Sequence, residues 1–173
     1  VTLQRALEIS YSNTIELGAE KITIEEAHGR ILYEDIKSYV NDPAFDNSAM
    51  DGWAVRIEDC QVGSRLKIIG TSQAGKNNPP TVRKGEACRI MTGAPIPQGA
   101  NSILIIENSK QEQDYITILD NPNPNYIRKS GENITIDQTV LKSGSVLGPF
   151  EISLAATSGN WQVNVVKKPI VSI

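Results

Sequence analysis

The sequence predicts an α+β, β-rich fold in which one β-rich module is inserted into a small mixed α/β unit. Apolar residues recur at helical spacing at the start of the chain, and strand-like patterns follow from about 53 to 141. A helix-start signal and an alternating strand then close the chain. This order predicts a β-rich domain over 42–142, with 1–41 and 143–173 folding together as the mixed unit.

The first flank begins with a predicted helix. Apolar and small residues over 2–12 follow helical spacing, and Thr2 is placed to cap the helix N-terminus. A short helix over 25–28 is expected to end at Gly29, because glycine suits the position after a helix. The segment 31–40 then predicts an extended chain.

The central part predicts a series of strands separated by turns. The predicted strands lie around Trp53–Val55, Leu66–Ile69, Ala87–Met91, Ile103–Ile106 and Tyr115–Leu119. The continuous apolar run of the fourth predicts a strand covered on both faces, whereas the fifth alternates as a half-exposed strand does. The separators, rich in proline, glycine and asparagine, are Ala74–Pro80, Pro95–Asn101 and Asp120–Asn125, and we expect surface loops there.

The second flank carries a clear helix signal. Pro149 suits a first helical position, Glu151 suits the positive end of the helix, and Gly159 supplies the stop. Apolar and polar residues then alternate over 161–165, which predicts a strand. We expect the N-terminal helix to pack beside this second helix.

Composition excludes several classes of protein. The chain has 173 residues with 17 basic and 20 acidic side chains, a formal charge of -3, so it lacks the basic footprint of a nucleic-acid binder. We find no run long enough to span a membrane and no signal-peptide pattern. Cys60 and Cys88 are isolated, as reduced thiols in a cytosolic protein are. His28, the only histidine, cannot build a histidine metal cluster or a Ser/His triad.

The most informative segment is 45–56, with the sequence FDNSAMDGWAVR. Its first half is rich in residues that bond locally or need backbone freedom, and its second half reads as a strand. A polar loop held beside a rigid strand makes a plausible binding edge. The simpler alternative is an Asp/Asn-rich turn that binds nothing.

This segment closely resembles the FDNSAMDGYAVR signature of the molybdopterin molybdenumtransferase family, which includes the MoeA proteins and the gephyrin E domain. Trp53 stands where the family usually has tyrosine. Further family-like strings follow in order, at 89–97 (RIMTGAPIP) with Gly99 and Ala100, at 128–134, and at 144–149. The similarity runs from about Leu3 to the last residue. It implies the complex β fold of the MoeA N-terminal region, inserted into a helical domain.

The resemblance also implies a function in molybdenum cofactor biosynthesis. Members of the family insert molybdate into adenylylated molybdopterin, release AMP and use a divalent cation such as Mg²⁺. By the same resemblance we expect a cytoplasmic homodimer, with a molybdopterin adenylyltransferase as a further partner.

Two residues are the predicted catalytic groups. Asp51 occupies the position of an important family aspartate and could ligate Mg²⁺, although its alternative is a turn-capping role before Gly52. Thr92 lies where a strand enters a Gly/Pro turn, so backbone N–H groups and its hydroxyl could face a phosphate. Gly93 would let that ligand approach closely.

The remaining predicted site residues are contacts to the substrate. They are Asn47, Ser48, Met50, Gly52, Gly93 and Arg128. Asp46 is a weaker candidate that orders the same loop. Asn133 departs from the family pattern, which has aspartate there, and an amide cannot supply a negative ligand. The departure leaves open a tolerant cation site, a structural position or a less active homologue.

The ends of the chain suggest a longer protein. Val1 already lies within the amphipathic pattern, and residues 168–173 read as an apolar strand that has just begun. We therefore expect an N-terminal portion that is inactive alone and lends one wall to a site completed elsewhere. The alternative is a non-catalytic scaffolding or oligomerisation module of gephyrin-like architecture, which Asn133 alone favours.

Overall fold

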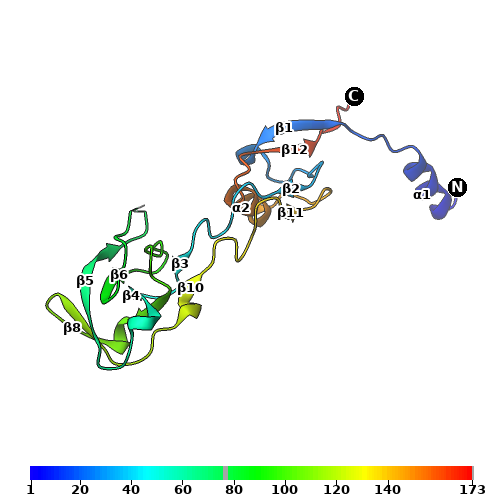
Figure 1. The fold of residues 1–173 in the computed structure, drawn as a ribbon. Helices are drawn as coiled ribbons and strands as arrows, with labels where there is room; N and C mark the ends of the chain where they lie inside the picture. Colours follow the sequence, from blue (N-terminus) through cyan, green and yellow to red (C-terminus); the bar gives the residue numbers. More distant parts are fainter. Residues whose placement is uncertain (76–77, 173) are drawn as a thin grey trace. The chain divides into compact units, whose positions relative to one another are not determined.

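The computed structural model describes residues 1–75 and 78–172, which form two compact units (Figure 1). The outer unit combines residues 1–39 with the chain from Asp137 onward, and the inner unit is the continuous segment 40–136. The expected boundaries, 41/42 and 142/143, therefore move. The second moves because residues 139–141 form a strand that pairs with the outer unit.

The outer unit is built from two short antiparallel ladders and one packed helix. Strand β1 (Ala19–Thr23) pairs with β12 (Gln162–Val166), and β2 (Ile36–Lys37) pairs with β11 (Thr139–Leu141). The helices are η1 (Ile24–Glu26) and α2 (Pro149–Thr157). Its core residues are Ala27, Leu32, Ile36, Leu147, Ala155, Val163 and Val165. The strands β1 and β11 were not predicted, and only two residues of the expected extended segment 31–40 form a strand.

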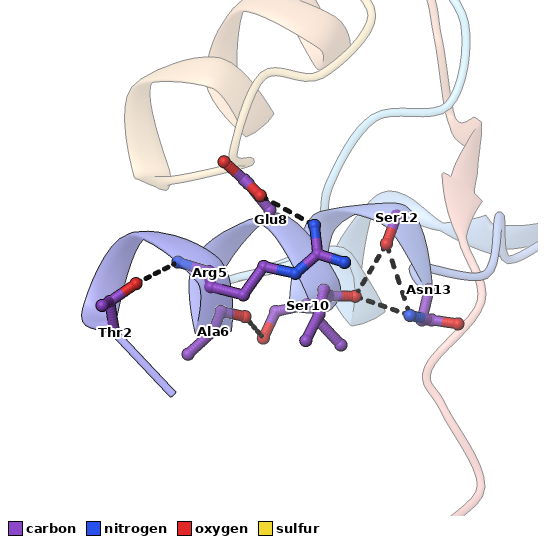
Figure 2. A network of polar contacts seen from close by, with 8 residues as sticks. Thr2, Arg5, Ala6, Glu8, Ser10, Ser12 and Asn13 are labelled. Carbon is purple, nitrogen blue, oxygen red and sulfur yellow. Dashed lines mark hydrogen bonds and ion pairs between the residues drawn. The ribbon is translucent and has the colours of Figure 1, made fainter.

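Helix α1 (Leu3–Ser12) forms as predicted but does not pack as predicted. Thr2 Oγ1 accepts a hydrogen bond from the Arg5 N–H at 3.4 Å, and Asn13 Nδ2 donates to the Ile9 carbonyl at the other end (Figure 2). No residue of α1 is buried. The expected contact with the helix after Pro149 is therefore wrong within this chain, because the apolar side chains of α1 remain in solvent.

Helix α2 and the strand after it follow the sequence signals closely. The Gly148 N–H donates to Glu151 Oε2 at 3.0 Å, which satisfies one of the free donors of the first turn. In β12, Val163 and Val165 are buried and alternate with more exposed neighbours. Residues 167–172 form no strand, so the apolar strand expected there is not observed; Ile173 lies outside the described residues.

The inner unit is built on a six-stranded sheet in the order β7-β4-β6-β5-β9-β8 (Figure 1). The strands are β4 (Gly52–Val55), β5 (Arg65–Ser72), β6 (Glu86–Ile90), β7 (Ser102–Ile105), β8 (Ser109–Glu112) and β9 (Tyr115–Ile118). All neighbours are antiparallel except β5 and β6, which are parallel. The sequence predicted five of these strands and missed β8. The predicted loop 74–80 lies partly outside the described residues.

Strand β4 is buried on both faces and separates two apolar clusters. One cluster contains Trp53, Val55, Cys60, Leu66, Ala87, Leu104, Ile116 and Ile118. The other contains Ala54, Val82, Cys88, Ile90, Ala94, Ile103 and Ile127. Because successive side chains of a strand point to opposite faces, Trp53 and Ala54 enter different clusters. The apolar run 103–106 was predicted to be covered on both faces; Ile103 and Leu104 are fully buried, but Ile105 is half-buried and Ile106 is exposed and lies after the strand.

Short elements complete the inner unit. They are β3 (Asn47–Ser48), β10 (Ile127–Arg128), η2 (Ile57–Asp59), η3 (Ile106–Asn108) and η4 (Pro124–Tyr126). Burial raises the pKa of the Cys60 and Cys88 thiols to about 11, so both are unreactive free thiols. Among the described residues, no helix has the length and apolar content needed to cross a membrane.

Candidate functional site

The predicted site residues come together in the inner unit, where three loop segments meet at the end of β4. The ladder between β3 and β10 pairs Asn47 with Arg128. On its other side, the Ser48 N–H donates to the Ala94 carbonyl at 3.1 Å, and the Gly93 N–H donates to the Ser48 carbonyl at 2.8 Å. Strand β3 thus holds the turn around Thr92 and the segment after Tyr126 on either side of one polar loop.

Asp51 and Thr92 are in direct contact. Asp51 Oδ1 accepts from the Thr92 backbone N–H at 2.8 Å and from Thr92 Oγ1 at 3.0 Å. These bonds lower the pKa of the Asp51 carboxyl below its ordinary range, and the positive charge of Arg89 adds to the effect. Asp51 therefore caps a distant turn rather than its own loop. Its other oxygen, Oδ2, has no partner among the described residues and both side chains are exposed.

The turn after β6 does not offer its backbone N–H groups to an anion, contrary to the prediction. The Thr92 N–H is held by Asp51, the Gly93 N–H by Ser48 and the Ala94 N–H by the Met91 carbonyl at 3.0 Å. Each donor is already satisfied inside the protein. An anion at this turn would therefore need donors other than these three N–H groups.

Asn47 and Ser48 are buried, so the structure gives them a framework role. Ser48 Oγ donates to the Met50 carbonyl at 2.6 Å, and Asn47 Nδ2 donates to the Phe45 carbonyl at 3.3 Å. Both side chains therefore shape the loop through hydrogen bonds to its own carbonyl groups. The substrate contacts expected of Asn47 and Ser48 stay predictions, and Met50, which precedes Asp51, is exposed.

The two predicted glycines are required for different reasons. A Cβ at Gly52 would lie 2.1 Å from the Leu104 carbonyl oxygen, so β4 and β7 could not approach as they do. At Gly93 there is open space around the Cβ position, but φ is +76°, a left-handed conformation that glycine adopts most readily. Gly52 is thus a packing requirement inside the sheet, and Gly93 remains accessible at the turn.

Residues 128–134, the third of the family-like strings, hold the 45–51 loop through charged contacts. Lys129 Nζ pairs with Asp46 Oδ2 at 2.7 Å, and the Ser130 N–H donates to Asp46 Oδ1 at 2.9 Å. These two partners lower the pKa of Asp46. Both oxygens of Asp46 are therefore occupied.

Asn133 joins two charged residues of the inner unit. Its Oδ1 accepts from Arg128 Nη2 at 3.1 Å, and its Nδ2 donates to Asp42 Oδ2 at 2.8 Å. An aspartate could accept from Arg128 but could not donate to Asp42. The amide therefore has a structural role in this chain, and Arg128 is partly engaged by it.

The oxygen atoms around Asp51 are too few to bind a magnesium ion alone, and they suit one only if water or a substrate supplies the remaining ligands. Among residues 1–75 and 78–172, no three His, Cys, Asp or Glu side chains gather as a metal site. Mg²⁺ often binds through one or two carboxylates and completes its shell with water and substrate phosphates. The free oxygen of Asp51, beside the Thr92 hydroxyl, fits that arrangement.

Arg89 was not among the predicted site residues, although it lies in a family-like string three residues before Thr92. Arg89 lies opposite Trp53 in the neighbouring strand. This pairing could not be predicted from the sequence alone, because it depends on the register of the two strands.

The chain matches the family described as MoeA N-terminal region (domain I and II) over residues 1–159. It is 38% identical over 156 residues to a molybdopterin molybdenumtransferase of Haemophilus influenzae, covering 89% of this chain and 39% of that protein. It is 34% identical over 180 residues to the protein of that name from Staphylococcus aureus strain MSSA476, covering 100% and 43%.

The fold is also that of a solved relative. A molybdopterin biosynthesis moeA protein from Pyrococcus horikoshii superimposes with a TM-score of 0.87 at 34% identity, over 98% of this chain and 46% of that one. The chain thus spans less than half the length of these relatives.

Proposed function

The chain belongs to the family of the MoeA N-terminal region (domain I and II), and from this premise we propose that the protein carrying it is a molybdopterin molybdenumtransferase. It inserts molybdate into adenylylated molybdopterin and releases AMP during molybdenum cofactor biosynthesis. The observation that supports this role is the exposed Asp51–Thr92 pair, which keeps one carboxylate oxygen free at the edge of a rigid sheet.

The side chains of this chain act by positioning and charge. Asp51 fixes the Thr92 turn through two hydrogen bonds and keeps its hydroxyl beside the free carboxylate oxygen. Asp51 Oδ2 would hold Mg²⁺ together with the substrate, and the ion would supply positive charge against the negative groups of that substrate. A carboxylate held ionised at neutral pH is ready for this role without a proton having to leave.

The other predicted residues divide into two groups. Met50, Gly93 and Arg128 border the exposed edge or are half-buried beside it, and we propose them as substrate contacts. Asn47, Ser48 and Gly52 are buried and position the loop instead. This division assigns the ligand to the side of the loop that carries Asp51.

The proposed activity is tested by supplying the full-length protein with adenylylated molybdopterin, molybdate and Mg²⁺. We expect release of AMP together with the molybdenum-loaded cofactor. The isolated chain 1–173 is expected to be inactive, because it spans under half of its relatives. Absence of turnover by the folded full-length protein would overturn the proposal and favour a scaffolding module.

We further propose that the full-length protein is a homodimer to which α1 contributes. Leu3, Leu7 and Tyr11 are spaced on one face of the helix and are exposed, at 78%, 47% and 74%. Burying them against a second copy would account for an amphipathic helix with no buried residue. Light scattering should give a dimer, and Leu3→Asp with Leu7→Asp should weaken it; a monomeric unsubstituted protein contradicts this role.

The remaining assignments concern supply and location. Because the substrate carries an adenylyl group, we propose a molybdopterin adenylyltransferase as the partner that delivers it. We place both proteins in the cytoplasm. Co-purification of the two proteins and cell fractionation test these points, and recovery of this protein only with membranes would contradict the second.

A further inference from the structure

Arg89 is held in a fixed position on an aromatic ring at the centre of the sheet. It lies in β6 directly opposite Trp53 of β4, and its guanidinium carbon is 5.1 Å from the centroid of the Trp53 ring. The ring is itself fixed, since Trp53 is 1% exposed and its Nε1 donates to Ser109 Oγ at 2.9 Å. The stack therefore presents the guanidinium in one orientation.

This guanidinium makes no ion pair and no hydrogen bond within residues 1–75 and 78–172. Its Nη1 is buried without an acceptor, one of two such side-chain atoms in that part of the chain. By contrast, Arg30 pairs with Glu20, and Arg56 lies 3.6 Å from the carboxylate of Asp59. A buried cationic donor without an acceptor is costly, and a stacked ring does not replace a hydrogen-bond acceptor.

Arg89 also lies next to the candidate site. It is three residues before Thr92, and Gly52, which follows Asp51, pairs with the residue after Arg89. Its charge acts on the Asp51 carboxylate. The N–H groups of Thr92, Gly93 and Ala94 are already used inside the protein, so Arg89 is a donor near this turn that still lacks an acceptor.

We propose that Arg89 is an oxyanion-binding residue of the candidate site, with its guanidinium positioned by Trp53 to bind a tetrahedral oxyanion of the substrates. A planar guanidinium donates two parallel hydrogen bonds to such a group. The proposal rests on the proposed function for the source of the anion, which is the phosphate of the adenylylated substrate or molybdate itself. Both share the chemistry that Arg89 recognises, and binding measurements separate them.

The test measures equilibrium binding of AMP and of molybdate, separately, to the full-length protein and its variants. Arg89→Gln should weaken binding of one of the two probes by roughly 10- to 100-fold, the scale for losing a charge-assisted pair of hydrogen bonds. Arg89→Lys keeps the positive charge but not the two parallel N–H donors of a guanidinium, so its affinity for that probe should lie between those of the unsubstituted protein and Arg89→Gln. The matched control is Arg65→Gln, because Arg65 also stacks on an aromatic ring of this sheet, 4.8 Å from the Tyr115 centroid.

Two further measurements separate a loss of anion binding from a loss of folding. If Arg89→Gln does not fold, the Arg89 Nε–H resonance of the unsubstituted protein, followed during titration with each probe, replaces it. In turnover, Arg89→Gln should raise the KM for one substrate about 10-fold or more, with kcat changed by less than about threefold.

The outcomes distinguish this proposal from the proposed function. Wild-type affinity for both probes in folded Arg89→Gln, or an unmoved Nε–H resonance, overturns the role of Arg89 while leaving turnover by the unsubstituted protein intact. Arg89-dependent binding in a protein that never converts the substrate supports the anion site and overturns the enzyme.

Discussion

Two aspartates, one in each unit, make the same set of contacts. In the inner unit, Asp46 pairs with Lys129 at 2.7 Å and accepts from the Ser130 N–H at 2.9 Å. In the outer unit, Asp35 pairs with Lys142 at 2.7 Å and accepts from the Ser143 N–H at 2.9 Å.

The likeness extends to the neighbouring residues. Each serine hydroxyl donates to the carbonyl two residues before the aspartate, Ala44 in one unit and Tyr33 in the other. The glycine after each serine, Gly131 or Gly144, donates its N–H to the carbonyl three residues before the aspartate. A Lys-Ser-Gly segment therefore ties two distant parts of the chain together twice.

The recurrence shows that the Asp46 contacts are a way of joining chain segments rather than a device of the candidate site. Asp46 lies in the same family-like string as Asp51, five residues before it, yet both carboxylate oxygens of Asp46 are occupied. Asp51 differs because Thr92 takes only one of its oxygens. The two aspartates therefore differ in the number of carboxylate oxygens left free, and this difference supports the proposal of Asp51 as the ligand-binding one.

The largest expected effect comes from Asp51 and Thr92. Asp51→Asn removes the charge and keeps the shape, and Thr92→Ala removes the hydroxyl while leaving the backbone bond. Each should lower turnover by the full-length protein by roughly one to three orders of magnitude, the scale for one positioned polar group. Steady-state kinetics measure this, with Asp46→Asn as control. Near-normal turnover in a folded variant would return that residue to a turn-fixing role.

The two glycines separate the framework from the exposed edge. Gly52→Ala forces a methyl group against the Leu104 carbonyl, so we expect a loss of unfolding free energy of about 3 kcal/mol or more. Gly93→Ala should lower the unfolding free energy by only about 1–2 kcal/mol, the cost of placing alanine in a left-handed backbone conformation. Urea denaturation compares them. Equal losses would mean that β4 and β7 can separate without cost.

Asn133 tests whether a family-like aspartate can be restored. In Asn133→Asp a carboxylate replaces the amide that donates to Asp42, and the Arg128 contact offsets the repulsion only in part. We expect a loss of roughly 0.5–1 kcal/mol in unfolding free energy at pH 7, measured by urea denaturation. A variant that is more stable at pH 7 and responds more strongly to Mg²⁺ would instead reveal a cation near this position.

The smallest effect concerns the two lysine-bound aspartates. Their pKa values are lowered, chiefly by Lys129 and Lys142, from an ordinary value of 3.8. A lowered carboxyl pKa contributes stability above the ordinary value, and that contribution is lost as the pH falls through the folded value. Asp35→Asn and Asp46→Asn should therefore differ slightly from the unsubstituted protein at pH 7 and converge with it below pH 3.8. Thermal unfolding at several pH values measures this; a large loss for one alone would break the likeness.

Local signals in the sequence were sufficient for part of this description. Thr2, Pro149 and Gly159 marked the ends of helices, and the apolar run at 103–106 marked a strand whose residues 103 and 104 are buried. The family-like strings predicted Asp51 and Thr92 as site residues, and the two are in contact in the structure. These features depend on residues close in sequence, or on a long family signature.

Features set by distant pairing could not be predicted in this way. Strands β1 and β11 are short and become strands only beside partners more than a hundred residues away. Whether a polar residue of the loop faces solvent depends on register, which buries Ser48 and exposes Asp51. The unpaired state of Arg89 likewise follows from which side chains surround it.

The dependence of turnover on Mg²⁺ tests the distinction between the two aspartates most directly. In the full-length protein, Asp51→Asn should raise the half-saturating Mg²⁺ concentration by about tenfold or more, because Asp51, unlike Asp46, has a free carboxylate oxygen. Asp46→Asn should leave that concentration within about twofold of the unsubstituted protein, because its oxygens are held by Lys129 and Ser130. An unchanged Mg²⁺ dependence in Asp51→Asn, or an equal shift in both variants, would contradict the account.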